Sequence, residues 1–415
     1  MDKPIIQSLL DVDFYKDTMG QAIFHRHANV PVKLAFQNRH KHVRLAECID
    51  VAQLRENLEH VRSLRFTRQE LHFLMGTFEY NQPMFKLDYI EFLQTLRLPE
   101  FHIDMHDGQL VLEFLGEWAS VTRWETLALQ VVSELYGKHE TQDAPRPEGG
   151  RRLDEKIKAF KANPSITFSD FGTRRRFSRS WQEYVVGRLA ELFPAPSVFV
   201  DNEQFRGTSN TLLAMKYGLT PMGTNAHELP MVYSAIYRDE DEKAGRLVSS
   251  ERVLEDWETE YGLGLSIFLP DTYGSDYFFS KVVPRRMLET WKGSRHDSGS
   301  PKEYGDKVIR IYEAAGIDPA TKLVVFADGL DVSLINDLER YFRGRIQTTF
   351  GIGTNLTNDL GPAALSIVVK PVSANGLPVV KLSDNIAKAS GDPAEVDRMK
   401  RLAGYSVNFA QACRY

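Results

Sequence analysis

The chain has 415 residues, of which 42% are hydrophobic and 26% charged, the balance of an ordinary globular protein. Its 51 Lys and Arg against 56 Asp and Glu give a formal net charge of −5, which argues against nucleic acid as the main partner. Two cysteines exclude a disulfide framework, and no run approaches the ~18 apolar residues of a membrane span, so we expect a cytoplasmic protein with no membrane partner.

The first 137 residues are predicted to form an α+β domain. A strand is expected over 32–39, and the turn pair Asp107-Gly108 lies between two alternating runs that predict a hairpin. A long apolar helix is expected over 121–137. Apolar residues three and four apart predict three shorter helices, over 51–63, 67–75 and 86–96.

The polar stretch 138–152, with two prolines and two glycines, is predicted to be a loop or linker. A second domain is expected over 153–415, where short β-rich runs alternate with helical patterns. This alternation predicts a mainly parallel sheet, open or closed into a barrel. The pair Asn375-Gly376 predicts a terminal hairpin, which with a C-terminal helix is expected to pack on the first domain.

Nearly every apolar run of the second half ends in small or functional residues. Because the carboxyl ends of parallel strands share one face, these residues predict an enzyme with one composite site. The residues are Asp170, Gly172 and Arg174; Asn202; His227 and Glu228; Asp271; Asp328 and Gly329; and Gly351, Gly353 and Thr354.

Two motifs suit anion binding. The turn GIGTN at 351–355 can present backbone N–H groups to a phosphate, or it can be a tight loop without a ligand. In RHDSGSPKE at 295–303, Ser300 predicts a capped helix start that attracts anions. Arg295 adds positive charge there, and Asp297 can accept from ribose hydroxyls or bind Mg²⁺; a solvated, well-capped helix is the alternative.

Three further features have a possible chemical function, and each also has a purely structural interpretation. The arginines of 174–179 can clamp a phosphate or a carboxylate, or form a solvated basic face. His227 can act as a base or accept a phosphoryl group, or be a hydrogen-bonded structural histidine. Asp271 and Asp328 can hold ribose hydroxyls or Mg²⁺, or cap helices. Metal-ligand spacing is absent around His227, so a catalytic zinc is not expected.

Eight motifs together resemble the nicotinate phosphoribosyltransferase family and span nearly the whole chain. The resemblance implies an irregular parallel α/β barrel with an N-terminal α+β domain packed on it. It also implies a homodimer with a shared active site, in which the Tyr-Lys segment of one subunit reaches the site of the other. In chain order the motifs are SLLDVDFYKDTM (8–19), FSDFGTRRR (168–176), RGTSN (206–210), GTNAHELP (223–230), LPDTYGSD (269–276), RHDSGSP (295–301), FADGLD (326–331) and FGIGTN (350–355).

The resemblance further implies a reaction. Nicotinate and 5-phosphoribosyl-1-pyrophosphate would give nicotinate mononucleotide and pyrophosphate, with ATP hydrolysis coupled through a phosphorylated histidine. Mg²⁺ would be held largely by pyrophosphate, so no metal site built from the protein is expected.

Roles for individual residues also follow from the resemblance. Phe171 and Tyr15 would sandwich the pyridine ring, and Arg174 would face the carboxylate of nicotinate. Arg295 and Asp297 would address the ribose and pyrophosphate. The remaining roles are phosphorylation at His227, a polar contact near the ribose from Asp271, and binding of the 5-phosphate by Gly329, Gly353 and Thr354 in or near the turn that Gly351 begins.

Ser209 favours nicotinate over nicotinamide. The related nicotinamide enzyme has an aspartate in the matching place, whereas a hydroxyl can donate to a carboxylate. Three alternatives remain: a nicotinamide phosphoribosyltransferase, a non-catalytic barrel that binds phosphoribosyl ligands, and an unrelated aldolase or isomerase barrel. The last would need a Schiff-base lysine or a glutamate base, and Lys370, the lysine at a plausible position, lies in the expected terminal hairpin.

Overall fold

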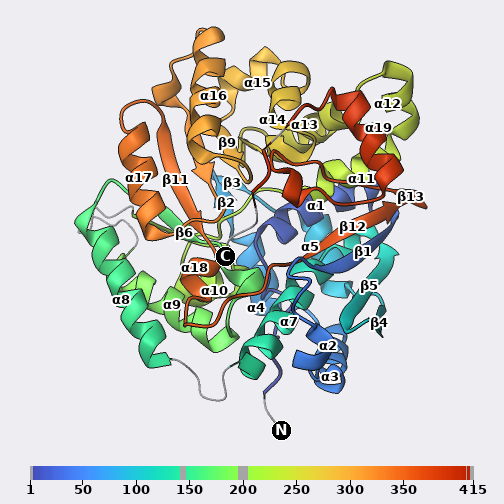
Figure 1. The fold of residues 1–415 in the computed structure, drawn as a ribbon, viewed down its shortest axis with the longest axis vertical. Helices are drawn as coiled ribbons and strands as arrows, with labels where there is room; N and C mark the ends of the chain where they lie inside the picture. Colours follow the sequence, from blue (N-terminus) through green and yellow to red (C-terminus); the bar gives the residue numbers. More distant parts are fainter. Residues whose placement is uncertain (1–2, 141–145, 195–203, 408, 412–415) are drawn as a thin grey trace.

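Two sheets organise the chain, one antiparallel and one parallel (Figure 1). The structure, a computed structural model, describes residues 3–140, 146–194, 204–407 and 409–411. The antiparallel sheet has the strand order β13-β12-β1-β5-β4, and the parallel sheet the order β7-β6-β11-β10-β9-β8. A single apolar core runs through both parts, from Ile5 to Ala403.

The antiparallel sheet combines the two ends of the chain. Asp107 and Gly108, both with positive φ, turn the predicted hairpin of β4 and β5. The predicted terminal hairpin also forms, and its first strand pairs along β1 in this sheet (Figure 1). The hairpin is therefore part of the N-terminal sheet and does more than pack on it. The strands are β1 (Pro31–Asn38), β4 (Phe101–His106), β5 (Gln109–Glu117), β12 (Ile367–Ala374) and β13 (Leu377–Pro378).

Helices of the N-terminal part of the chain cover this antiparallel sheet and extend to the parallel sheet. The three predicted short helices form, and Thr67 begins one of them with a capping box to Glu70. The predicted long helix begins later and ends later than expected. The helices are α1 (Tyr15–His27), α2 (Leu45–Cys48), α3 (Val51–Ser63), α4 (Arg68–Met75), α5 (Leu87–Thr95), α6 (Trp118–Val121) and α7 (Trp124–Glu140), with a small hairpin of β2 (Phe78–Glu79) and β3 (Gln82–Pro83).

The parallel sheet confirms the expected strand–helix alternation. Every ladder in it is parallel, and within the described residues no ladder joins its end strands β7 and β8, which makes the barrel irregular. Its strands are β6 (Phe168–Asp170), β7 (Phe205–Thr208), β8 (Ile267–Phe268), β9 (Gly293–His296), β10 (Leu323–Phe326) and β11 (Gln347–Ile352). Its larger helices are α9 (Arg179–Leu192), α11 (Glu228–Ile236), α13 (Val248–Tyr261), α16 (Pro301–Ala314), α17 (Val332–Phe342) and α19 (Pro393–Ala403).

The expected loop over 138–152 is wrong wherever the structure describes it. Helix α7 extends to Glu140, and α8 (Arg146–Ala162) includes the rest. The polar composition predicted a loop, but the segment is the start of an amphipathic helix. This helix buries Leu153, Ile157 and Phe160, and charged residues form ion pairs along its exposed side. Residues 141–145 and the predicted strand end Asn202 lie outside the described residues.

The segment before α1 joins the two parts of the chain. Asp13 forms an isolated bridge with Asn210, and the N–H of Phe14 donates to the carbonyl of Ser209 over 2.6 Å. Asp11 and Arg176 make a buried ion pair with N–O distances of 2.8 and 3.0 Å. Residues 11–14 are thus fixed at the carboxyl end of β7.

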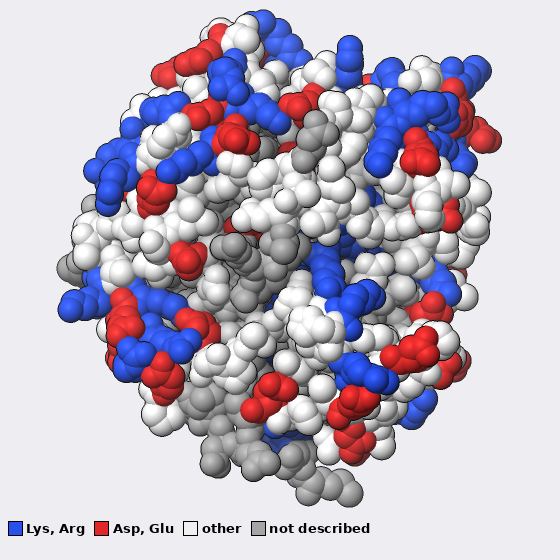
Figure 2. Space-filling model, in the orientation of Figure 1, with Lys and Arg blue, Asp and Glu red and all other residues white. Residues whose placement is uncertain are grey.

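On the face shown in Figure 2, basic side chains gather in a hollow near the middle of the molecule, in the region where Figure 1 places β12. The positive potential that an anionic substrate needs is therefore local, against a net negative chain. None of the helices in the described part of the chain is both long and apolar enough to cross a bilayer.

Candidate active site

A cavity of about 1220 Å³, open to solvent, lies at the carboxyl ends of the parallel strands. Segments from the N-terminal part close it: Asp13 and Tyr15 at the start of α1, Glu125 on α7, and 368–371 on β12. The cavity brings together every residue that the family resemblance singles out for a role except Asp271. These are Tyr15, Phe171, Arg174, Ser209, His227, Arg295, Asp297, Gly329, Gly351, Gly353 and Thr354. The strand-end residues Asp170, Gly172 and Asp328, in contrast, do not line it.

At one end of the cavity aromatic and cationic groups lie together. Gly351 allows this, because a Cβ there would lie 2.3 Å from Cδ2 of Phe171. The guanidinium of Arg174 lies 5.7 Å from the centre of the Tyr15 ring. This Tyr15 belongs to the same chain as the cavity it lines, and the expectation that the segment also reaches a partner's site stays a prediction.

A carboxylate that sequence analysis missed lies at the same end. The Ser209 hydroxyl donates to Oδ1 of Asp13 over 2.6 Å, and Nε of Arg174 lies 3.4 Å from Oδ2 of Asp13. The Ser209 proton is therefore already engaged, which corrects the simple expectation that it faces the substrate. Burial raises the pKa of Asp13 to about 6, although Arg174 opposes the shift.

Lys16, which has no accessible side-chain surface, holds two carboxylates in place. Its ammonium lies 2.6 Å from Glu125 and 2.6 Å from Glu228. Burial disfavours ionisation of Glu125, but Lys16 and Arg174 outweigh burial and lower its pKa. Glu125 was also missed, since nothing in the sequence of a buried helix marks the one position that faces a cavity.

His227 lies at the start of α11 among three polar partners. Nδ1 is 2.9 Å from Oγ1 of Thr272, and Nε2 is 2.9 Å from Oδ2 of Asp297 and 2.7 Å from Nζ of Lys381. Burial and then the Lys381 cation lower the pKa of His227 to about 4. The imidazole is therefore neutral near pH 7, as a nucleophile or base must be.

Asp271 lies behind His227 and outside the cavity lining. It is 1% exposed, accepts from Ser298 over 2.6 Å and lies 3.0 Å from Nζ of Lys381. Burial opposes ionisation, but Lys381 and His227 lower its pKa. Its expected role near the ribose stays a prediction, and in the structure its Oδ1 lies 3.7 Å from Nε2 of His227.

Lys381 and Lys388 were missed because the segment after the terminal hairpin looked purely structural. Lys388 donates to Oδ1 of Asp328 over 2.5 Å and to the carbonyl of Asp297 over 2.9 Å. Both lysines follow β13 and reach the barrel face from the N-terminal sheet. The only sequence signal for these two site residues was that they are lysines soon after the turn pair Asn375-Gly376.

Arg295 and Asp297 also line the cavity. Nη2 of Arg295 is 3.4 Å from Oδ1 of Asp297, and Nε of Arg295 is buried without a hydrogen-bond partner. Burial opposes ionisation of Asp297, but Arg295 and His227 hold its pKa well below the ordinary value. A fixed positive and a fixed negative group thus face the same space.

Another part of the cavity wall, next to Phe171, is made of backbone. Gly329 has a φ of 59°, and Gly353 leads into the single turn of α18 (Thr354–Thr357), whose first N–H groups lack intrahelical partners. Such groups suit a phosphate. Ser300 caps α16 as predicted, but this helix start is not among the residues that line the cavity.

Sequence analysis left the roles of several cationic residues open, and the structure shows which of them line the cavity. Arg175 lines the cavity and donates to the carbonyl of Ile367, whereas Arg176 is buried against Asp11. Lys370 also lines the cavity from β12, so its place in the hairpin was no reason to set it aside. Burial, with Lys381 next, holds the pKa of Lys370 well below its ordinary value.

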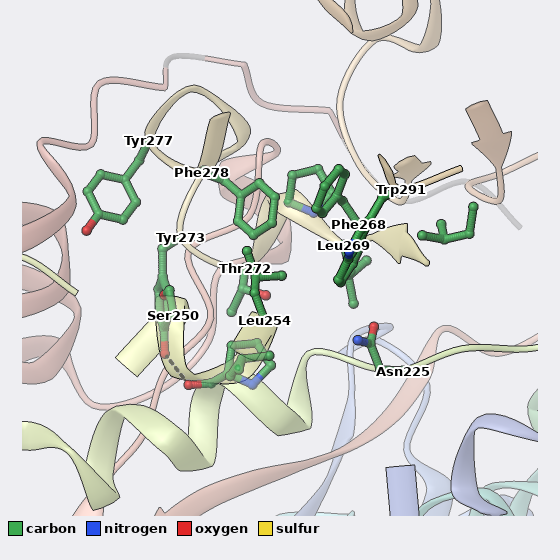
Figure 3. A pocket seen from close by; sticks show the side chains of 15 residues that line it. Asn225, Ser250, Leu254, Phe268, Leu269, Thr272, Tyr273, Tyr277, Phe278 and Trp291 are labelled. Carbon is green, nitrogen blue, oxygen red and sulfur yellow. Dashed lines mark hydrogen bonds between the residues drawn. The ribbon is translucent and has the colours of Figure 1, made fainter. Parts of the chain in front are cut away.

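A second, smaller cavity lies behind Thr272 and has mostly apolar walls (Figure 3). Rings of Phe268, Tyr273, Phe278 and Trp291 surround it. It contains none of the predicted site residues. The anionic chemistry therefore belongs to the larger cavity.

Comparisons with known proteins agree with this geometry. The model of the nicotinate phosphoribosyltransferase family matches residues 166–405, and the model of that family's N-terminal domain matches 10–133. The nicotinate phosphoribosyltransferase structure from Porphyromonas gingivalis is 31% identical, with a TM-score of 0.86 over 97% of this chain and 100% of that one. The one from Vibrio cholerae is 31% identical, with a TM-score of 0.85 over 98% and 96%. A structure from Saccharomyces cerevisiae is 28% identical, with a TM-score of 0.87 over 98% and 100%.

Proposed function

The chain belongs to the nicotinate phosphoribosyltransferase family, and on that premise we propose how its cavity performs the reaction. The reaction takes nicotinate and 5-phosphoribosyl-1-pyrophosphate to nicotinate mononucleotide and pyrophosphate, in NAD salvage from nicotinate. One observation supports it above all. A single cavity is lined by the aromatic rings of Tyr15 and Phe171, by Arg174 and Arg295, and by glycine-rich backbone.

The chemistry requires the bond from ribose C1 to pyrophosphate to lengthen first, leaving an oxocarbenium-like sugar. The pyridine nitrogen attacks with its own lone pair, so no general base is needed. Tyr15 and Phe171 hold the ring by stacking, and Arg174 holds the carboxylate. Arg295 stabilises the negative charge of the departing pyrophosphate.

We propose that Mg²⁺ enters with pyrophosphate. His227, Asp271 and Asp297 place possible ligand atoms within 4.8 Å of one another, but the Lys381 ammonium lies 3.0 Å from Asp271 and 2.7 Å from His227. That cation already offsets the charge of the set, which favours contact through Asp297 alone. When bound, Mg²⁺ would neutralise charge on the leaving group.

We further propose that His227 couples ATP hydrolysis to the transfer. A proton on Nδ1 that bonds to Thr272 leaves the Nε2 lone pair facing Lys381. Nε2 attacks the γ-phosphorus, and ADP departs with the electrons of the broken P–O bond. Water later takes the phosphoryl group as phosphate. The Lys381 ammonium stabilises the negative charge that the phosphoryl group brings.

The coupling is tested by nicotinate mononucleotide formation with and without ATP in His227→Ala. We expect basal turnover to remain and stimulation by ATP to vanish, together with the label that the wild-type protein takes from γ-labelled ATP. His102→Ala, an exposed histidine on β4, is the matched control and should keep both. Stimulation that survives in His227→Ala would disprove the phosphohistidine.

A second substrate has one observation in its favour. The Asp13 carboxylate beside Ser209 could accept a hydrogen bond from the amide of nicotinamide. Nicotinamide therefore requires this carboxyl group to be ionised and to accept a hydrogen bond, whereas the carboxylate of nicotinate is repelled by an ionised group.

A further inference from the structure

Asp13 is the least satisfied charged group at the arginine-bearing end of the cavity. It is 2% exposed and lines the cavity, and its two oxygens differ. Oδ1 accepts from Ser209 over 2.6 Å, whereas Oδ2 accepts no hydrogen bond and has only Nε of Arg174 at 3.4 Å. A buried oxygen without a donor is costly for an ion but natural for a carboxylic acid that can donate outward.

The charged groups around Asp13 are predominantly negative. Arg174 faces it from the turn after β6, Glu125 from α7, and Asp170 from the end of β6. Asp170 is satisfied separately by Thr208, Gln182 and the N–H of Gly172. Arg174 is thus the one cation in this group, and it already lies near both Asp13 and Glu125.

Nicotinate would bring a third carboxylate to the same guanidinium. Glu125 keeps its negative charge because Lys16 is 2.6 Å away, so it cannot relieve the excess. Asp13 has no such partner. Asp297, whose charge also acts on Arg174, is kept ionised by Arg295. Among Asp13, Glu125 and Asp297, Asp13 is therefore the one that can be neutralised at the lowest cost.

We propose that Asp13 takes up a proton from solvent when nicotinate binds, and that its Oδ2–H then donates to the nicotinate carboxylate. This inference rests on the proposed function. Ser209 continues to donate to Oδ1, so both oxygens are satisfied in the complex. Burial already raises the pKa of Asp13 to about 6 before substrate arrives, so the proton is close to being bound near neutral pH.

The proposal assigns acid-versus-amide selection to Asp13 and places Ser209 in a positioning role. Ionised Asp13 would accept from the amide of nicotinamide and would repel nicotinate. Protonated Asp13 would instead donate a hydrogen bond to nicotinate, and its Oδ2–H could not accept one from the amide of nicotinamide. Nicotinate affinity should then fall about tenfold per pH unit above neutrality, until the pH passes the raised pKa of Asp13 in the complex.

The test is calorimetric titration of the full-length protein with nicotinate at pH 7.5, in two buffers of different ionisation enthalpy. The buffer dependence gives the protons taken up, and we expect close to one per nicotinate bound. In Asp13→Asn the amide keeps the bond from Ser209 and can donate to the carboxylate. We expect uptake to fall to near zero and KM for nicotinate to lose its pH dependence, while KM for phosphoribosyl pyrophosphate keeps its profile.

Ser209→Ala provides a second readout that a purely structural role would not move. The Ser209 hydrogen bond lowers the pKa of Asp13, so its loss should move the pH profile of KM for nicotinate to higher pH. Nicotinate binding without proton uptake, or equal uptake in Asp13→Asn, would overturn the inference alone. A protein that neither binds nor converts nicotinate at any pH would overturn the proposed function as well.

Discussion

At the scale of single residues, the pKa of His227 is lowered first by burial and then by a lysine 154 positions away in the sequence. The imidazole is part-buried and its Nε2 lies between Lys381 and Asp297. Lys381 is the second cause, after burial, that keeps the pKa of His227 near 4. A neutral imidazole across the physiological range is what phosphoryl acceptance needs.

Lys381→Met should therefore raise the pKa of His227 toward its ordinary value of 6.5. Because only the neutral imidazole attacks ATP, stimulation should be lost as pH falls through the higher pKa. We expect the acid limb of ATP-stimulated turnover to move up by about one pH unit or more. Lys381→Arg keeps the charge and serves as control. An acid limb that stays in place in Lys381→Met would contradict this role.

Gly351→Ala tests whether the ring of Phe171 positions the pyridine ring of nicotinate. The new methyl would lie 2.3 Å from the Phe171 ring, so the ring must move. We expect KM for nicotinate to rise by about fivefold, since a stacked ring position contributes ~1 kcal/mol. Gly150→Ala on α8, with open space around the added atom, should leave KM unchanged. Equal KM values in both variants would show that Phe171 does not position the ring.

Sequence reasoning found residues that end strands and missed those that arrive from elsewhere. Phe171 and Arg174 lie just after β6, and Gly351 lies near the end of β11. Asp13 reaches the cavity, and Lys381 reaches His227, through tertiary packing that no local pattern encodes. Asp271 illustrates the opposite error, because its strand-end position did not reveal that it points behind His227.

At the scale of elements, periodicity predicted helices better than composition predicted loops. Helices α3, α4 and α5 lie where apolar spacing placed them. Helix α8 was missed because its prolines, glycines and charges outweighed a narrow apolar stripe. The joining of β12 to β1 is a long-range pairing, which turn chemistry at Asn375 and Gly376 could suggest only as a hairpin.

The N-terminal segment is held on the barrel by Asp11. Both members of its pair with Arg176 are 1% exposed. Asp11→Ala would leave Arg176 buried and uncompensated, and should lower the free energy of unfolding by about 3–5 kcal/mol. Denaturant titration measures this, and Glu155→Ala, which breaks an exposed pair with Arg151, is the control. A loss no larger than that of the control would show that the segment is not anchored there.

At the scale of the whole molecule, one chain supplies both sides of the site. Tyr15, Asp13 and Glu125 come from the N-terminal part, and Phe171, Arg174 and Ser209 from the barrel. A homodimer stays a prediction, but these six side chains need no second copy to meet.

Specific activity should therefore not depend on protein concentration. Dilution across three orders of magnitude should change turnover per chain by less than twofold, whereas a site completed by a partner would lose activity as dimers dissociate. Initial rates, with sedimentation velocity at the same concentrations, check this. Activity that falls in step with dissociation would contradict a site built within one chain.

The central claim is tested most directly by offering the protein equal concentrations of labelled nicotinate and nicotinamide, with phosphoribosyl pyrophosphate and Mg²⁺, with and without ATP. We expect nicotinate mononucleotide as the product, formed faster with ATP. Nicotinamide mononucleotide as the main product, or no mononucleotide from either base, would contradict it.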